Sequence, residues 1–213
     1  EQVLGVERLL AVKGYIDELA DFVKNVYLID VAAVGAFYAD WTKYGAGVTN
    51  YLCVPDLPLD TKGTQFAMPG GYIANKDLAS YKPIKTFGDD YWIKGVEESA
   101  KHAWYEGAKP LHPYQGETKP QYTDFQDDAK YSWLKSPTFY GKPAQVGPLA
   151  RVPNMLAAGH EPTKKYAPAA LDLVSTLAKT KVGLDAMHST IGRHAARAVS
   201  CAVQVDQLAE QWQ

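Results

Sequence analysis

Cysteine is scarce in this sequence. The chain contains only Cys53 and Cys201, which lie far apart. Their number and separation exclude a disulfide-rich scaffold and every CxxC-type metal site within the chain. Long apolar runs are also missing. The best uncharged run, Val31–Ala39, is less than half of the roughly 20 residues that a membrane-spanning helix needs. The sequence therefore predicts neither a disulfide framework nor a transmembrane segment.

The chain also lacks an excess of either charge. Its 22 basic and 24 acidic residues give a formal net charge of −2, which argues against a nucleic-acid-binding protein and a polybasic membrane anchor. Hydrophobic residues make up 46 % of the chain, which argues against intrinsic disorder. No signal peptide is recognisable. Because the first residue is Glu1, we expect a chain that is processed, truncated or cut from a longer one.

Residues 1–43 have the periodicity of a helix. Apolar residues recur at spacings of three and four and form one stripe: Leu9, Val12, Ile16, Leu19, Val23 and Val26. Continued at this spacing, the stripe reaches Asp30, where burial of a charge is costly. We favour a first helix that ends near Tyr27 and a second that Asp30 caps. The alternative is one continuous helix in which Asp30 is buried against a basic partner.

The middle of the chain is less regular. Glycine and proline punctuate residues 44–86, where "TNYLCV" and "GGYIAN" predict short strands in hairpins. A helix is predicted over 89–106, with Trp92, Val96 and Ala100 on one side. A long loop and a hairpin are predicted over 107–149, the hairpin within 131–149.

Residues 150–213 are predicted to be helical. A short helix follows Pro148 and is cut or kinked by Pro153, and the next begins at Pro168 and ends at Gly183. Asp185 or Ser189 caps the last helix. Its seam of mostly small residues requires a close partner helix: Ile191, Ala195, Ala198, Ala202, Val205, Ala209 and Trp212.

These patterns predict a mainly α fold. We expect one domain over residues 1–213, a long antiparallel helix bundle with small irregular β-hairpin insertions. The two terminal helices should pair within it.

Residues that carry metal or acid–base chemistry form no local motif. The histidines share no metal-binding spacing: His102, His112, His160, His188 and His194. The acidic doublets are predicted to be solvated surface charges: Asp89–Asp90, Glu97–Glu98 and Asp127–Asp128. Arg193 and Arg197 flank His194 on the last helix, where they form either an anion clamp or, as we favour, a buried network with an acid such as Asp30.

Aromatic residues make up 12 % of the chain, and many lie in the irregular segments. Amphipathic rings of this kind suit an interface with another polypeptide. They equally suit the anchoring of long loops onto the chain's own helices, and the sequence does not distinguish these two interpretations.

Several motifs together resemble a known family. They are "KYSWLKSPTFYGKPAQVGPLAR" at 130–151, "STIGRHAAR" at 189–197, "KHAWY" at 101–105, "LHPYQGETKPQY" at 111–122, "MPGG" at 68–71 and the opening helical segment. Taken in their order along the chain, which is the family's order, they resemble the central part of a nickel–iron hydrogenase large subunit over nearly the whole chain. One departure is Ile29, where the family commonly has proline before the aspartate.

This resemblance implies a parent enzyme that splits dihydrogen into protons and electrons, or forms it. The family holds nickel and iron through two CxxC pairs that are absent here, and Cys53 and Cys201 match neither pair. No catalytic, cofactor-binding or metal-binding residue can therefore be assigned to this chain, which should bind no nickel–iron centre itself. The implied partners are an iron–sulfur small subunit and the missing parts of the large subunit.

Two other interpretations remain open. One is a metal-free structural or interaction relative that kept the scaffold, and the other is a small-molecule-binding domain with an aromatic pocket. The resemblance leaves the location undetermined. It favours a periplasmic location, or association with a membrane through the partner subunit, over the cytoplasm.

Overall fold

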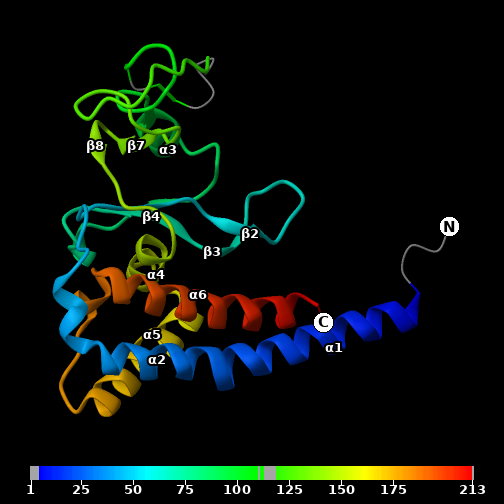
Figure 1. Cartoon of the computed structure of the whole chain (residues 1–213). Helices are drawn as coiled ribbons and strands as arrows, with labels where there is room; N and C mark the ends of the chain where they lie inside the picture. Colours follow the sequence, from blue (N-terminus) through cyan, green and yellow to red (C-terminus); the bar gives the residue numbers. More distant parts are fainter. Residues whose placement is uncertain (1–4, 110, 113–118, 213) are drawn as a thin grey trace. The chain divides into compact units, whose positions relative to one another are not determined.

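The computed structural model describes residues 5–109, 111–112 and 119–212. The sequence alone predicts one domain, whereas the chain divides into two compact units. The first, here the helical unit, comprises Glu1–Gly47 and Gly147–Gln213. The second, here the strand unit, comprises Val48–Val146. Figure 1 shows the elements of both units along the chain.

The N-terminal helical segment is continuous. α1 (Val6–Phe22) runs through a π-helical turn, η1 (Val23–Tyr27), directly into α2 (Leu28–Phe37). The predicted break near Tyr27 with Asp30 as a cap is therefore wrong. A π-turn inserts one extra residue into the helical repeat. Burial accordingly moves from Ile16, Ala20 and Val23 to Ala32 and Gly35, which leaves Asp30 exposed rather than buried as the alternative required.

The 3₁₀ turn η2 (Ala39–Lys43) follows α2. The remaining helices of this unit are α4 (Pro148–Ala157), α5 (Glu161–Ala178), the 3₁₀ turn η4 (Leu184–Met187) and α6 (Thr190–Gln211). The prediction that Pro153 cuts α4 is wrong, as is the prediction that the next helix starts at Pro168. Pro168 is exposed, so water can reach the carbonyl group whose hydrogen bond it removes. α5 ends before the predicted Gly183, because Lys179 adopts a left-handed conformation with φ 52°.

The last helix confirms its predicted start and seam. Ser189 is the cap, since its Oγ accepts a hydrogen bond from the Gly192 N–H at 3.0 Å. Ala198 and Ala202 are fully buried in the seam, and Val205 is nearly so. α6 packs against α1, α2, α4 and α5, which includes the predicted contact between the terminal helices. The small side chains allow these helices to approach closely.

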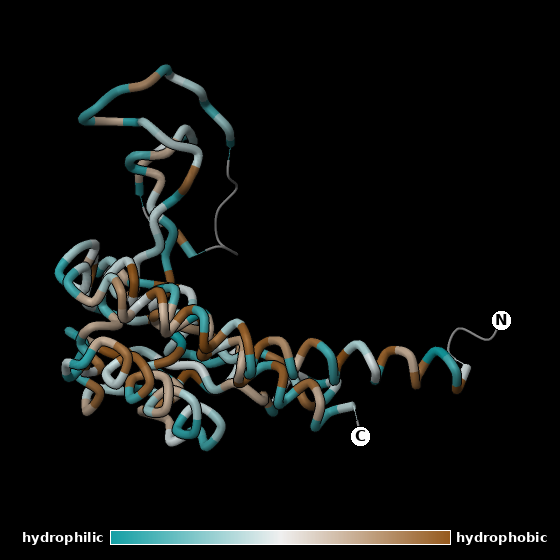
Figure 2. Tube along the Cα trace, turned by 60° about the horizontal axis from the view of Figure 1, so that its bottom comes forward, coloured by the Kyte–Doolittle hydropathy of each residue, from teal (hydrophilic) through white to brown (hydrophobic). Residues whose placement is uncertain are grey.

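The N-terminal stripe is only partly buried. Ile16 and Val23 are buried as predicted, but Leu9, Leu19 and Val26 are exposed. Hydrophobic residues recur along α1 and α2 in Figure 2, and many are exposed. The described part of the chain therefore leaves apolar surface on both helices open to solvent.

The strand unit begins with the predicted hairpin segments. β1 (Tyr51–Cys53) pairs antiparallel with β4 (Gly70–Ile73), and β4 pairs with β5 (Lys82–Ile84). A separate two-stranded sheet joins β2 (Asp56–Pro58) and β3 (Phe66–Met68). The 3₁₀ turn η3 (Leu78–Ser80) precedes β5.

The predicted helix over 89–106 is wrong beyond its first turns. α3 (Asp90–Gly95) gives way to β6 (Val96–Ser99), which pairs with β7 (Ser136–Phe139). A Cβ on Gly95 would lie 2.5 Å from ring atoms of Phe139 and Tyr140, so β7 needs glycine here to close over the end of α3. The apolar residues that suggested one helix instead belong to a core to which both α3 and the strands contribute.

The hairpin predicted within 131–149 is present. β8 (Lys142–Pro143) pairs with β7 across Tyr140 and Gly141, which both have positive φ, as a tight two-residue turn requires. The core of the strand unit consists of Leu52, Tyr72, Ile84, Val96, Phe139 and Ala144.

Candidate functional site

The two cysteines lie in different surroundings. Cys53 is buried in β1, and its thiol donates to the Pro69 carbonyl oxygen at 4.0 Å. Cys201 is half-buried in α6, where burial raises the pKa of the thiol despite the nearby Arg197. Metals bind the thiolate, which burial disfavours at Cys201. Neither cysteine forms a disulfide.

The histidines lie in several separate elements. His102 Nδ1 lies 2.6 Å from the Ala129 carbonyl oxygen. His160 bridges the Thr163 hydroxyl at 2.8 Å and the Gln207 amide at 3.1 Å. His112 and His188 are buried, whereas His194 is exposed on α6. Among the described residues, no group of three or more His, Cys, Asp or Glu side chains could hold a metal ion.

Arg193 ties the start of α6 to the segment after η2. Its guanidinium donates to the carbonyl oxygens of Gly45 and Ala46, the latter at 3.1 Å. Arg197 and Asp30 are both exposed. The arginine therefore joins parts of the helical unit, but through backbone carbonyl groups rather than through the Asp30 carboxylate that we predicted as a candidate.

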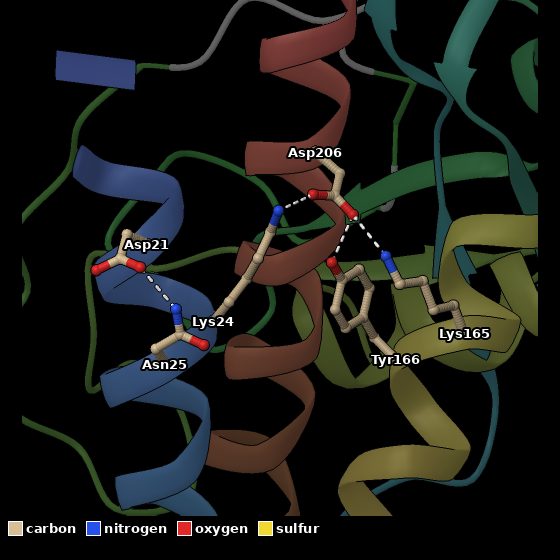
Figure 3. Close-up of polar contacts among 6 residues, drawn as sticks. All are labelled: Asp21, Lys24, Asn25, Lys165, Tyr166 and Asp206. Carbon is tan, nitrogen blue, oxygen red and sulfur yellow. Dashed lines mark hydrogen bonds and ion pairs between the residues drawn. The ribbon is translucent and has the colours of Figure 1, made fainter. Parts of the chain in front are cut away.

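A polar cluster that sequence analysis missed joins three helical segments (Figure 3). The Asp206 carboxylate of α6 pairs with Lys24 of η1, accepts from the Tyr166 hydroxyl of α5 and lies 3.4 Å from Lys165 Nζ. Burial alone would raise the pKa of Asp206, but hydrogen bonds from Lys24 and Tyr166 outweigh it and lower the pKa. The hydrogen bond to Asp206 raises the pKa of Lys24. The cluster joins helices, and its side chains line none of the three cavities described below.

One signal could have indicated this cluster. Asp206 lies between Val205 and Gln207, which are both buried. The residues four positions before and after it are Ala202 and Glu210, so no base on the same helix face can pair with it. A basic partner therefore had to come from another helix.

The aromatic residues of the strand unit support both earlier interpretations. Trp104, Tyr105, Tyr122 and Trp133 pack against one another, with ring centroids 5.0–6.2 Å apart. We call these four the aromatic cluster. Tyr122 and Trp133 nevertheless remain exposed. The rings thus anchor their own loops while presenting an outer surface.

The cavities of the helical unit are small and apolar. Two of them, about 30 and 40 Å³, share Val31, Leu171, Val174, Met187 and Ala195. Such volumes hold about one water molecule each, and an apolar lining offers it no partners. Thr42 lines the larger of the two, and its hydroxyl already donates to the Ala39 carbonyl oxygen at 3.0 Å.

A larger depression lies in the strand unit. Its volume is about 340 Å³, and aromatic rings and two lysines line it: Tyr72, Tyr91, Phe139, Tyr140, Lys82 and Lys142. This size is within the range of small-molecule sites. The third interpretation, a ligand-binding domain, therefore stays a prediction.

Comparison with known sequences decides the family. The sequence model of the nickel-dependent hydrogenase family matches residues 1–213. The chain belongs to this family. In the described residues, no helix is long and apolar enough to cross a membrane.

This hydrogenase chain resembles part of much longer relatives. It is 47 % identical over 210 residues to the hydrogenase-2 large chain of Escherichia coli K12, covering 99 % of this chain and 37 % of that one. It is 33 % identical to the uptake hydrogenase large subunit of Rhodobacter capsulatus, covering 92 % and 34 %. The chain therefore spans about a third of the length of these relatives.

A solved structure shows the same fold. The Ni-Fe-Se hydrogenase of Desulfovibrio vulgaris Hildenborough matches with a TM-score of 0.77 and 25 % identity, covering 100 % of this chain and 41 % of that one. The mainly helical hydrogenase fold with small antiparallel sheets is thus confirmed.

The described residues of this hydrogenase chain do not fit a nickel–iron centre. Soft metals select thiolates at fixed geometry. Burial disfavours the thiolate of Cys201, and the described residues form no group of three or more donors that could hold a metal ion. No step of hydrogen chemistry is assigned to the side chains of the described residues.

Proposed function

We propose that this chain is a section of a nickel–iron hydrogenase large subunit and serves as scaffold without metal ligands. The complete enzyme would interconvert dihydrogen with protons and electrons. The observation that carries this proposal is the family match over the whole chain, combined with the lack of a donor cluster in its described residues. The nickel–iron centre would belong to parts of the enzyme outside these residues.

The scaffold role is supported by how the helical unit is packed. Small residues on α6 let several helices converge on one seam, and the Lys24–Asp206–Tyr166 cluster joins three of the segments. We propose that these helices form a long antiparallel bundle. Close packing of this kind is stiff, which suits a wall that holds a metal site in fixed geometry.

We further propose two partners, an iron–sulfur small subunit and the remaining parts of the large subunit. Large apolar side chains remain exposed along α1 and α2, among them Leu10, Tyr15, Phe22 and Phe37. Contiguous exposed apolar surface is typical of an interaction site. In the strand unit, the exposed rings of the aromatic cluster supply amphipathic surface of the kind enriched at interfaces.

Dihydrogen oxidation, measured for the chain alone and within a complete enzyme, tests this function. Dihydrogen oxidation with a viologen dye is measured for the chain alone and for a complete large subunit that contains it, assembled with its small subunit. We expect turnover in the complete enzyme and none in the chain alone. Turnover by the chain alone would contradict the scaffold assignment, and an assembled enzyme without turnover would contradict the hydrogenase assignment.

The alternative is a metal-free relative that acts as a structural or interaction protein. The lack of a metal-donor cluster among the described residues favours it, whereas the exposed apolar residues of α1 and α2 argue against a free-standing protein. A monodisperse monomer with cooperative melting would support the alternative. Self-association through apolar surface would support the interpretation that the chain is a section of a larger subunit.

A further inference from the structure

Lys130 places its ammonium group inside a ring of backbone carbonyl oxygens. Its Nζ lies 3.1 Å from the oxygen of Ala100 and 2.7 Å from that of Ala103. The oxygens of Tyr105 and Gly107 follow at 2.7 and 3.3 Å. All four carbonyl groups come from one short segment, 100–107, which Lys130 reaches from a distant part of the loop. We call these four oxygens the carbonyl ring.

The ring has more acceptors than the ammonium has hydrogens. A lysine ammonium carries three N–H donors, whereas four carbonyl oxygens face it. At least one donor must therefore be shared. Such an arrangement resembles the coordination of a spherical cation by carbonyl dipoles more than a set of directional hydrogen bonds.

The charge and size of the ring favour a monovalent cation. The four oxygens are neutral, whereas Ca²⁺ sites usually include carboxylates and hold oxygens at about 2.3–2.6 Å. Here the distances to Nζ run from 2.7 to 3.3 Å. Potassium and ammonium ions have the charge and size that match such a ring.

The carbonyl ring supports the aromatic cluster. Trp104 and Tyr105 lie within the segment that forms it. The residues that follow Lys130 in the sequence also bind this segment. The Tyr131 N–H donates to the His102 carbonyl at 3.1 Å, and the Trp104 N–H donates to the Ser132 carbonyl at 2.9 Å. Lys130 thus joins the two chain segments that carry Trp104 and Trp133.

We propose that the carbonyl ring of Ala100, Ala103, Tyr105 and Gly107 is a monovalent-cation site that the Lys130 ammonium fills from within the chain. When the side chain is shortened, free potassium or ammonium ions occupy the ring and restore the order of the segment. This proposal does not depend on the proposed function. It concerns the strand unit, whatever chemistry the complete protein performs.

Lysine labelling tests the wild-type protein. Amine acetylation is followed residue by residue by mass spectrometry, with the exposed Lys101 and Lys142 as internal references. We expect Lys130 to react at least about tenfold more slowly, because its nitrogen must leave the carbonyl ring before the reagent can reach it. Equal rates for Lys130 and Lys101 would overturn the occupied ring.

Shortening the side chain tests the cation site itself. Lys130→Ala should lower the melting temperature by roughly 5 °C in lithium chloride and shift tryptophan emission to the red. Potassium or ammonium chloride at the same ionic strength should restore both, saturably. Wild-type protein should show no difference among the three salts.

Lys130→Met is the matched control. The apolar methionine side chain fills the path to the carbonyl ring without adding a charge. Potassium should therefore restore neither the melting temperature nor the tryptophan emission of this variant. Equal effects of lithium and potassium on Lys130→Ala would overturn the proposal, as would recovery of Lys130→Met. A Lys130→Ala protein that stays unfolded in high potassium would also overturn it.

Discussion

The helical unit and the strand unit order their backbones differently. In the helical unit, α6 buries Ala196, Ala198 and Ala202 completely, and neighbouring helices close over these small residues. In the strand unit, strands of two to four residues are joined by segments whose backbone groups bind polar side chains. Asn50 contacts the Pro143 carbonyl and the Asn75 N–H, and Lys130 contacts four carbonyl groups.

This difference shows what each unit should tolerate. Apolar contacts depend on volume, so the helical unit should be most sensitive to cavities. Backbone groups in irregular segments need partners, so in the strand unit the loss of a single polar atom that binds such a group should measurably lower the stability. Four substitutions test this contrast.

Leu149→Ala should have the largest effect. Leu149 is buried in α4, and its truncation leaves a cavity that should lower the free energy of unfolding by about 3 kcal/mol. Leu208→Ala is the control, since Leu208 lies on α6 of the same unit with 42 % of its surface exposed. Urea unfolding of both variants measures the effect. Similar losses for the two would contradict volume-dependent packing in the helical unit.

Asp206→Asn should remove about 1.5 kcal/mol at neutral pH, because it leaves Lys24 without a charged partner in a partly exposed site. The pKa of Asp206 is lowered on folding, so its contribution is present above the unfolded value of about 4 and is lost as pH falls through the folded value. Unfolding measured across acid pH should show this loss in wild type and not in the variant.

Asp17→Asn serves as the control for that experiment. Asp17 pairs with Lys13 one turn away at 2.6 Å, and both side chains are well exposed. Exposed pairs of this kind stabilise by at most about 0.5 kcal/mol. Asp17→Asn should therefore keep the acid dependence of the wild type, and loss of that dependence in Asp17→Asn as well as in Asp206→Asn would count against the three-segment cluster.

Tyr81→Phe should cost about 1 kcal/mol in the strand unit, where the Tyr81 hydroxyl donates to the Gly70 carbonyl at 2.8 Å. Burial raises the pKa of Tyr81 from 10.0 to about 12. The stability from its neutral form is therefore complete below pH 10 and is lost as pH rises towards 12. Burial also raises the pKa of Tyr72, Tyr91 and Tyr166, so the tyrosinate absorbance should have a late-titrating part, and Tyr81→Phe should remove its component near pH 12. An unchanged titration would refute the assignment.

Phe37→Ser should have the smallest effect on stability. Phe37 is 81 % exposed at the end of α2, so the free energy of unfolding should change by less than about 0.5 kcal/mol. Self-association, followed by light scattering, should fall because apolar surface is removed. Lys181→Asp, at an exposed position of the same unit, controls for the change in polarity. A large loss of stability would show that Phe37 is part of the core.

Much of the helical unit could be predicted from sequence, because α6 follows a regular seam that depends only on local spacing. The π-turn at Val23–Tyr27 could not, since one inserted residue changes which face is buried without leaving a motif. The helix start predicted at Pro168 could not be corrected from sequence either. Pro168 is tolerated within α5 because it is exposed, and that exposure depends on tertiary packing.

The strand unit was less predictable for a related reason. Residues after Gly95 have helical periodicity, but their pairing with Ser136–Phe139 is a long-range contact that local spacing does not reveal. The carbonyl ring around Lys130 is invisible in the sequence, because its partners are backbone atoms. The absence of a CxxC pair, by contrast, is a property of the sequence itself, which contains only two widely separated cysteines.

The nickel content of the purified chain tests the central claim most directly. The chain is expressed alone under conditions that load nickel into hydrogenases, and metal per chain is measured by plasma mass spectrometry. The scaffold account predicts nickel and iron well below one atom per chain. One tightly held nickel per chain, with Cys53 or Cys201 among its ligands by X-ray absorption spectroscopy, would contradict it.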